Sequence, residues 1–130
     1  MKFQCLICAE KMMEQMTAAD AERHYEAYAE FTRGIRESGH FIAVNRLVPP
    51  HTAIAVRVRN GKVSTTDGPF AETKEQLGGY YVIEAEDLND AVQVASNTPG
   101  ARIGCVDERP VAEDAQTLRA LGLIAPETPR

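Results

Sequence analysis

A binding or catalytic role would most readily use the polar side chains between positions 66 and 85, in the run T-D-G-P-F-A-E-T-K-E-Q-L-G-G-Y-Y-V-I-E-A. Asp67 precedes Gly68-Pro69, so its carboxylate is expected to accept hydrogen bonds from nearby backbone amides in an Asx-type turn. The run has two interpretations: it is a structural hinge, or its charged side chains line a ligand pocket. In the pocket interpretation the lining side chains are Asp67, Glu72, Lys74 and Glu75.

Other candidate ligand contacts lie near the ends of expected strands. Paired carboxylates are one option, with Asp67 next to Glu84 or Asp107. Tyr80 and Tyr81 point to opposite faces of a strand, so that one can line a pocket while the other packs in the core. Arg109 and Arg46 could hold an anionic ligand by bidentate contacts, and His51 follows two prolines in a loop that could face a cleft. The alternative is that these charged side chains are simply solvated.

Cysteine and nucleophile motifs point away from redox, metal and acyl-transfer chemistry. Three cysteines are an odd number, which argues against a disulfide framework. Cys5 and Cys8 form a C-x-x-C, but they fall in an expected strand, where residues three apart point to opposite faces. The sequence has no G-x-S-x-G and no second cysteine or histidine pair to complete a zinc site. We therefore expect non-functional thiols, no bound metal and no cofactor.

Composition favours a small domain without nucleic-acid or membrane partners. The chain has 130 residues, a net charge of −5 and 44% hydrophobic residues, as expected of one globular domain. No basic block is interleaved with aromatic residues, so the sequence predicts no nucleic-acid binding. It contains neither a signal-peptide pattern nor an apolar run long enough to cross a bilayer, and we expect a cytoplasmic protein.

The first half of the chain reads as strand, helix and strand. Residues 2–9 are apolar on both faces, with Phe3, Cys5 and Ile7 on one side and Leu6 and Cys8 on the other. A helix is expected to begin at Thr17 and to end before Gly39. One helical face gathers residues at the spacing of an α-helix, and it includes His24, which we expect to be a core or interface histidine. A strand follows over residues 40–48, with His40 solvated at its start.

The second half reads as hairpin, strand, helix and strand. Residues 54–59 and 62–66 flank Asn60-Gly61, a strong two-residue hairpin signal. Gly78-Gly79 is expected to bring the backbone close to a neighbour before a strand over residues 80–85. Asp87 and Asp90 open a second helix that carries Leu88, Ala91, Val92 and Ala95. The last strand covers residues 102–111, and a short helical segment over residues 113–121 leads into a loose tail.

This order predicts an α+β domain with a ferredoxin-like fold, whose two helices cover one face of an antiparallel sheet. The first strand is apolar on both sides, so the other face of the sheet also needs a cover. A second copy of the chain is the simplest cover. The sequence therefore predicts a homodimer of the dimeric α/β barrel type.

Several of these segments together resemble the DGPF (DGPFAETKE) proteins of the YCII-related family. They are the first strand, the helix end I-R-E-S-G, the segment L-V-P-P, the run 66–85 and G-C-V-D-E-R-P-V near residue 110. The resemblance covers residues 1–112 and leaves 113–130 as a C-terminal extension. Asp107-Glu108 departs from it, because a Glu followed by Val is usual there.

The resemblance implies dimeric ferredoxin-like α/β barrels whose biochemical role is largely unassigned. Some members are encoded beside, or fused to, extracytoplasmic-function sigma factors, and smaller members are suggested to use a His–Asp pair. Two functions stay open for this chain. It is a barrel that binds a small organic ligand, with or without catalysis, or it is a non-catalytic regulatory module linked to such a sigma factor.

Overall fold

The computed structural model describes residues 1–10, 16–48, 50–68 and 75–127. Most of the expected elements are present, with shifted ends. In chain order the main elements are β1 (Lys2–Glu10), α1 (Ala18–Glu37), β2 (Phe41–Arg46), β3 (Ile54–Arg59), β4 (Lys62–Asp67), β5 (Glu75–Glu84), α2 (Leu88–Ser96), β6 (Gly104–Pro110) and α3 (Ala115–Ala120). Short 3-10 turns lie at Pro50–Thr52 and Pro99–Arg102.

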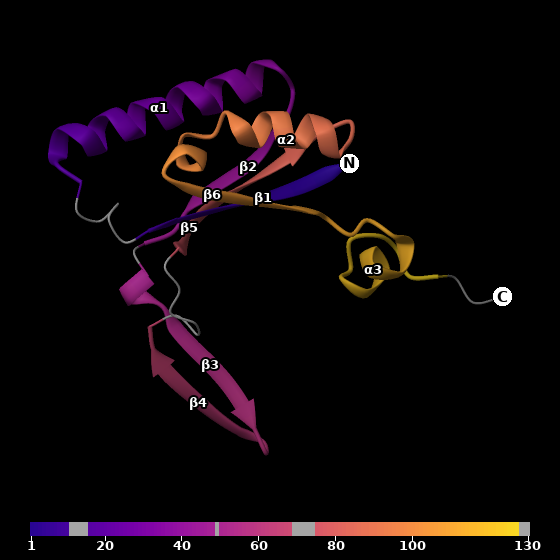
Figure 1. Cartoon of the computed structure of the whole chain (residues 1–130). Coiled ribbons are helices and arrows are strands. Elements are labelled where there is room, and N and C mark those ends of the chain that lie inside the picture. The colour runs from indigo at the N-terminus through magenta and orange to yellow at the C-terminus, as the bar shows by residue number, and fades with distance from the viewer. Residues whose placement is uncertain (11–15, 49, 69–74, 128–130) are drawn as a thin grey trace.

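Four strands form one antiparallel sheet in the order β2-β5-β1-β6, and β3 and β4 form a separate two-stranded ribbon. Helices α1 and α2 lie on one side of the four-stranded sheet, while the ribbon projects on the other side (Figure 1). This mixed α+β arrangement is compatible with the ferredoxin-like topology expected from the sequence. The face of the sheet that carries no helix is called the open face below.

Both long helices begin at the capping residues that the sequence indicated. The Thr17 hydroxyl accepts a hydrogen bond from the Asp20 amide at 3.1 Å, and the Asp87 carboxylate accepts one from the Asp90 amide at 2.8 Å. Each cap satisfies an amide that has no partner within the first helical turn. Helix α1 ends at Glu37 with Ser38 as its C-cap, and Gly39 follows with a φ of 82°, a conformation that glycine adopts at little cost.

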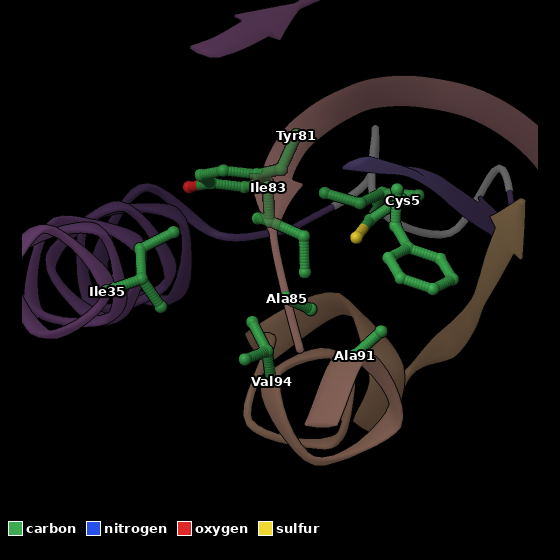
Figure 2. Close-up of a cluster of buried hydrophobic side chains, with 9 residues drawn as sticks. Cys5, Ile35, Tyr81, Ile83, Ala85, Ala91 and Val94 are labelled. Atoms are coloured by element: carbon green, nitrogen blue, oxygen red, sulfur yellow. The ribbon is translucent and has the colours of Figure 1, made fainter. Parts of the chain in front are cut away.

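The core lies between the helices and the inward face of the sheet, as Figure 2 shows. Alternate residues of β1 and β5 supply the inward side chains, because successive side chains in a strand point to opposite faces. The expected split of β1 is confirmed, with Phe3 and Cys5 buried and Leu6 and Cys8 on the open face. The buried cluster is Phe3, Cys5, Ile7, Ile35, Tyr81, Ile83, Ala85, Ala91 and Val94.

The starts of β5 and β6 need correction. Strand β5 begins at Glu75 rather than at Tyr80, because the ladder with β1 continues through the two glycines. Strand β6 begins at Gly104 rather than at residue 102, since the 3-10 turn occupies the preceding residues. The inward face of α2 consists of Ala91, Val94 and Ala95, whereas Leu88 and Val92 are 57% and 51% exposed.

The close backbone approach expected at Gly78-Gly79 is present at only one of the two glycines. A Cβ atom on Gly79 would lie 2.9 Å from the Asn45 carbonyl oxygen, whereas one on Gly78 would meet nothing closer than 3.9 Å. The second glycine therefore lets β5 and β2 pack closely. The hairpin is also confirmed: Asn60 and Gly61 both have positive φ, 53° and 74°, as a type I′ turn requires.

Candidate functional site

A cleft of about 950 Å³ opens between α1 and the inward face of the sheet, toward the end of β2 and the start of β5. Its volume suits a small organic ligand. Its floor comes from the sheet through residues such as Ile7, Val44 and Tyr81, and its roof comes from α1. The described polar and aromatic residues that line it are His24, Tyr25, Tyr28, Thr32, Arg33, Arg36, Asn45, Arg46, His51, Gln76, Tyr80 and Tyr81.

Two tyrosines form the deep aromatic wall of this cleft. The Tyr81 hydroxyl lies 2.7 Å from the Thr32 hydroxyl, and the Tyr28 hydroxyl accepts a hydrogen bond from the Gly100 amide at 3.0 Å. Burial raises the pKa of Tyr28 to about 12, and burial also raises the pKa of Tyr81. Both side chains are therefore neutral phenols, held in place by hydrogen bonds and able to pack against an apolar ligand.

The rim of the cleft is basic. Arg33 is paired with Glu30 and Glu37, and the Arg36 guanidinium lies 3.9 Å from the centre of the Phe41 ring. Arg46 lies over the Tyr25 ring at 5.2 Å and makes no ion pair with any carboxylate that the structure describes. No Asp or Glu is among the described residues that line the cleft. Arg46 is thus a cation that an anionic ligand can use.

His24 faces the same cleft from α1. Its ring meets the edge of the Tyr28 ring, with centroids 4.9 Å apart. Burial lowers the pKa of His24, because the desolvated site disfavours the imidazolium. The ring is therefore neutral at pH 7 and carries one donor and one acceptor nitrogen. The sequence placed His24 on the packed face of the helix, and the structure places it at the boundary between core and cleft.

The structure brings two of the eight predicted ligand-binding residues to the cleft, namely Tyr81 and His51. The predicted carboxylates are not brought together. Asp67 is exposed at the end of the β3–β4 ribbon. The Glu84 carboxylate forms an ion pair with the N-terminal ammonium group of Met1, with an N–O distance of 2.9 Å. Asp107 and Arg109 lie on the open face, opposite Leu6 and Gln4 of β1. Glu72 and Lys74, together with the Glu75 side chain, lie outside the described residues.

Sequence reasoning did not select several residues of the cleft, among them His24, Tyr28, Thr32 and Gln76. The first three share one face of α1, which was interpreted as a packed face because of its helical spacing. A signal was nevertheless present, since a fully packed helical face rarely carries a histidine, a tyrosine and a threonine in succession. Arg46, an anion contact expected from the sequence, lies in the cleft.

The expectation that His40 is solvated was wrong. Its side chain is 22% exposed, and Nε2 lies 3.1 Å from both carboxylate oxygens of Asp90, while Nδ1 lies 2.6 Å from the Ser38 hydroxyl. The Ser38 hydroxyl also donates to the Ile35 carbonyl oxygen at 3.2 Å. The Glu86 amide and His40 lower the pKa of Asp90. This cluster joins the end of α1 to the start of α2.

The cysteines lie as their strand positions predict. The Cys5 thiol is buried and donates to Glu108 Oε1 at 3.2 Å, and burial raises its pKa to about 12, so it stays a thiol. Cys8 lies on the open face, opposite Cys105 in the ladder between β1 and β6. In the part of the chain that the structure describes, no three His, Cys, Asp or Glu side chains gather closely enough to hold a metal ion.

No helix of the described chain has the length and apolar character needed to cross a membrane. A protein of Rhizobium meliloti (strain 1021), named "Uncharacterized protein R00369", is 41% identical over 78 residues. The match covers 58% of the present chain and spans 63% of the length of that relative. The family model of the YCII-related domain matches residues 1–114. The chain therefore belongs to the YCII-related domain family.

Proposed function

We propose that this protein binds a small organic anion with an apolar or aromatic body in the cleft beneath α1, as one subunit of a dimeric α/β barrel. One observation carries the proposal: an aromatic cleft of about 950 Å³ is bordered by a cation, Arg46, that has no described carboxylate partner. Ligand sites typically combine such an apolar lining with a few fixed polar groups. The proposal is for ligand binding and assigns no reaction to the cleft.

Each part of the cleft has a separate contribution to binding. Tyr28 and Tyr81 would contact the apolar body of the ligand, because their rings are buried and their hydroxyls are already engaged. Arg46 would hold the carboxylate or a similar anionic head by paired hydrogen bonds. Neutral His24 would accept or donate one hydrogen bond to a polar substituent. The charge of the ligand should therefore decide its affinity more than the details of its ring.

Phenylacetate is the probe for this proposal, with phenylacetamide as its neutral counterpart of nearly the same shape. We expect the acid to bind about 10- to 100-fold more tightly than the amide, because a hydrogen bond to a charged group contributes about 1.5–3 kcal/mol. Arg46→Gln should remove this difference. Affinities can be measured by titration calorimetry or by chemical-shift perturbation.

Arg23→Gln is the matched control, since Arg23 lies on α1 but pairs with Asp20 and is absent from the lining of the cleft. The acid should keep its advantage in this variant. Equal affinity of acid and amide for the parent protein would contradict the proposed ligand class. Shifts that map to the open face instead of α1 and the inward side of β5 would contradict the proposed site.

The open face supports the homodimer in this proposal. Leu6, Cys8 and Val82 are only partly exposed there, and Leu77 is 41% exposed. Helices α1 and α2 lie on the other side of the sheet in Figure 1. Apolar side chains on both faces of the central strands are typical of a sheet that is covered on both sides. A second copy packed face to face would cover them symmetrically.

Leu6→Lys should convert the protein to a monomer, because it places a charge at the centre of the open face, between Asp107 and Tyr80 in the ladder. Sedimentation velocity of the parent at micromolar concentration should give a dimer. Gln4→Lys, nearer the end of the same face, is expected to have a smaller effect. A parent protein that sediments as a monomer over this range would refute the homodimer.

A further inference from the structure

The β3–β4 ribbon, residues 54–67, stands apart from the rest of the molecule and is called the arm below. Ile54, Val56 and Val58 share one face of β3, and Val63 lies directly opposite Val58 in β4. These four side chains form an apolar stripe. They are 62%, 63%, 56% and 69% exposed, respectively, so no part of the described chain covers them. The other face carries Arg57, Arg59 and Lys62 together with small or polar residues.

An arm of this kind is unlike an ordinary surface loop. A two-stranded hairpin without a third strand or a packing helix is marginally stable in water. An exposed row of β-branched apolar residues on such a hairpin also invites association. Charges or proline within the apolar face are the ordinary protections; this face of the arm has one charge, Asp67 opposite Ile54 at the base of the arm, and none along Val56, Val58 and Val63. The stripe therefore has the composition of a contact surface.

We propose that the arm is a clasp that packs its apolar stripe against the second copy of the chain. This inference rests on the proposed homodimer. The arm projects on the same side of the sheet as the open face, opposite the two helices (Figure 1). Each strand of the arm is six residues long, so the arm extends about 20 Å. This length exceeds the distance of about 10 Å between two sheets packed face to face. An arm of that length runs beside any partner that is seated on the open face.

Charge also favours a second copy over an unrelated partner. The arm carries three basic residues and one acidic residue, a net charge of +2. The whole chain has a net charge of −5, so the remainder of each copy carries −7. A basic arm beside an acidic body is electrostatically complementary between two copies, and complementarity of this kind selects and orients partners. The arms of a two-fold dimer would make this contact twice.

Hydrogen exchange tests the clasp in the intact protein. In the dimer, the amides of residues 54–67 that pair in the ladder should exchange at least about 10-fold more slowly than in the Leu6→Lys monomer. Amides of β1 serve as the internal control, because they should stay protected in both proteins if the monomer is folded. An arm that exchanges equally fast in the dimer and in the monomer would overturn the clasp and leave the homodimer standing.

Three substitutions test the apolar stripe itself. The combined variant Val56→Thr, Val58→Thr and Val63→Thr keeps the β-branched shape and strand preference but replaces a methyl group with a hydroxyl at each position. We expect the dissociation constant of the dimer to rise about 100-fold by sedimentation velocity over a concentration series.

The control places Ser64→Thr and Thr66→Val on the opposite face of β4 and should leave the dissociation constant unchanged. An unchanged constant in the triple variant would show that the stripe does not contribute to the contact between two copies, and would overturn the inference. A parent protein that is monomeric at all concentrations would overturn both the inference and the homodimer on which it rests.

Discussion

Gly104→Ala is expected to destabilise the fold by about 3 kcal/mol, which is at the upper end of the usual cost of overpacking. Gly104 pairs with Ala9 where β6 joins β1, and a Cβ atom there would lie 2.1 Å from the Cys8 carbonyl oxygen and 2.8 Å from the Ala9 Cα. Both contacts are with backbone atoms, which cannot rotate away. The strands would have to separate at one end of the ladder. The midpoint of denaturant unfolding measures the loss.

Two other glycines of the sheet give a graded control. Gly79→Ala meets the Asn45 carbonyl oxygen at 2.9 Å and should cost less than Gly104→Ala. Gly78→Ala has its nearest contact at 3.9 Å and should change stability by no more than about 1 kcal/mol, since it also stiffens the unfolded chain. If all three variants unfold at the same denaturant concentration, strand spacing does not depend on these glycines.

Glu108→Val is expected to stabilise the protein by about 1–2 kcal/mol at pH 7, because it removes a poorly satisfied carboxylate from the inward face of the sheet. Glu108 lies opposite Cys5, whose thiol contacts Oε1, whereas Oε2 is buried and has no hydrogen-bond partner in the described structure. A valine would pack there, leaving only the weak thiol donor without its acceptor. Chemical denaturation at pH 7 measures the gain.

The pH dependence of this gain follows from the pKa of Glu108, which burial raises. The folded protein then holds this proton more tightly than the unfolded chain does. Stability from Glu108 is present below its unfolded pKa and is lost as the pH rises through its folded pKa. The gain from Glu108→Val should therefore be small under acidic conditions and should grow with pH across that interval.

Two variants separate charge from packing at this position. Glu108→Gln removes the charge, keeps an acceptor for Cys5, and should abolish the pH-dependent part of the difference. Asp107→Asn removes a charge from the neighbouring, exposed position on the open face and should change stability by less than about 0.5 kcal/mol. A Glu108→Val protein that is less stable than the parent at pH 7 would show that the carboxylate is well satisfied in the fold.

Much of the fold could be predicted from the sequence because its signals are local. Thr17 and Asp87 cap helices, and Asn60-Gly61 turns a hairpin, through contacts between residues a few positions apart. Likewise, the alternation of Phe3, Cys5 and Ile7 with Leu6 and Cys8 predicts which side chains of β1 point to each face of the sheet. Such patterns depend on backbone geometry alone. They can therefore be recognised in the sequence without the tertiary structure.

The ends of the elements were less predictable, because neighbouring strands decide them. Strand β5 begins at Glu75 since β1 continues to pair with it past the glycines. In α2 the spacing of Leu88, Ala91, Val92 and Ala95 suits a helix, but it did not show which part of the helix would face the sheet. That choice depends on how α2 packs, and the small residues Ala91 and Ala95 let it lie close to β6.

The candidate site depended most on tertiary structure. The sequence determined that Tyr80 and Tyr81 would point to opposite faces of one strand and that Arg46 would lie in another, but it did not determine that α1 lies over Tyr81 and Arg46. His24, Tyr28 and Thr32 read as a packed helical face, and only the space left between α1 and the sheet turns that face into a cleft lining. Similarly, His40 and Asp90 are 50 residues apart and meet only because β2 begins beside the start of α2. Local structure depends on residues that are neighbours in the sequence. A site depends on side chains from distant segments, and these segments come close together only when the chain folds.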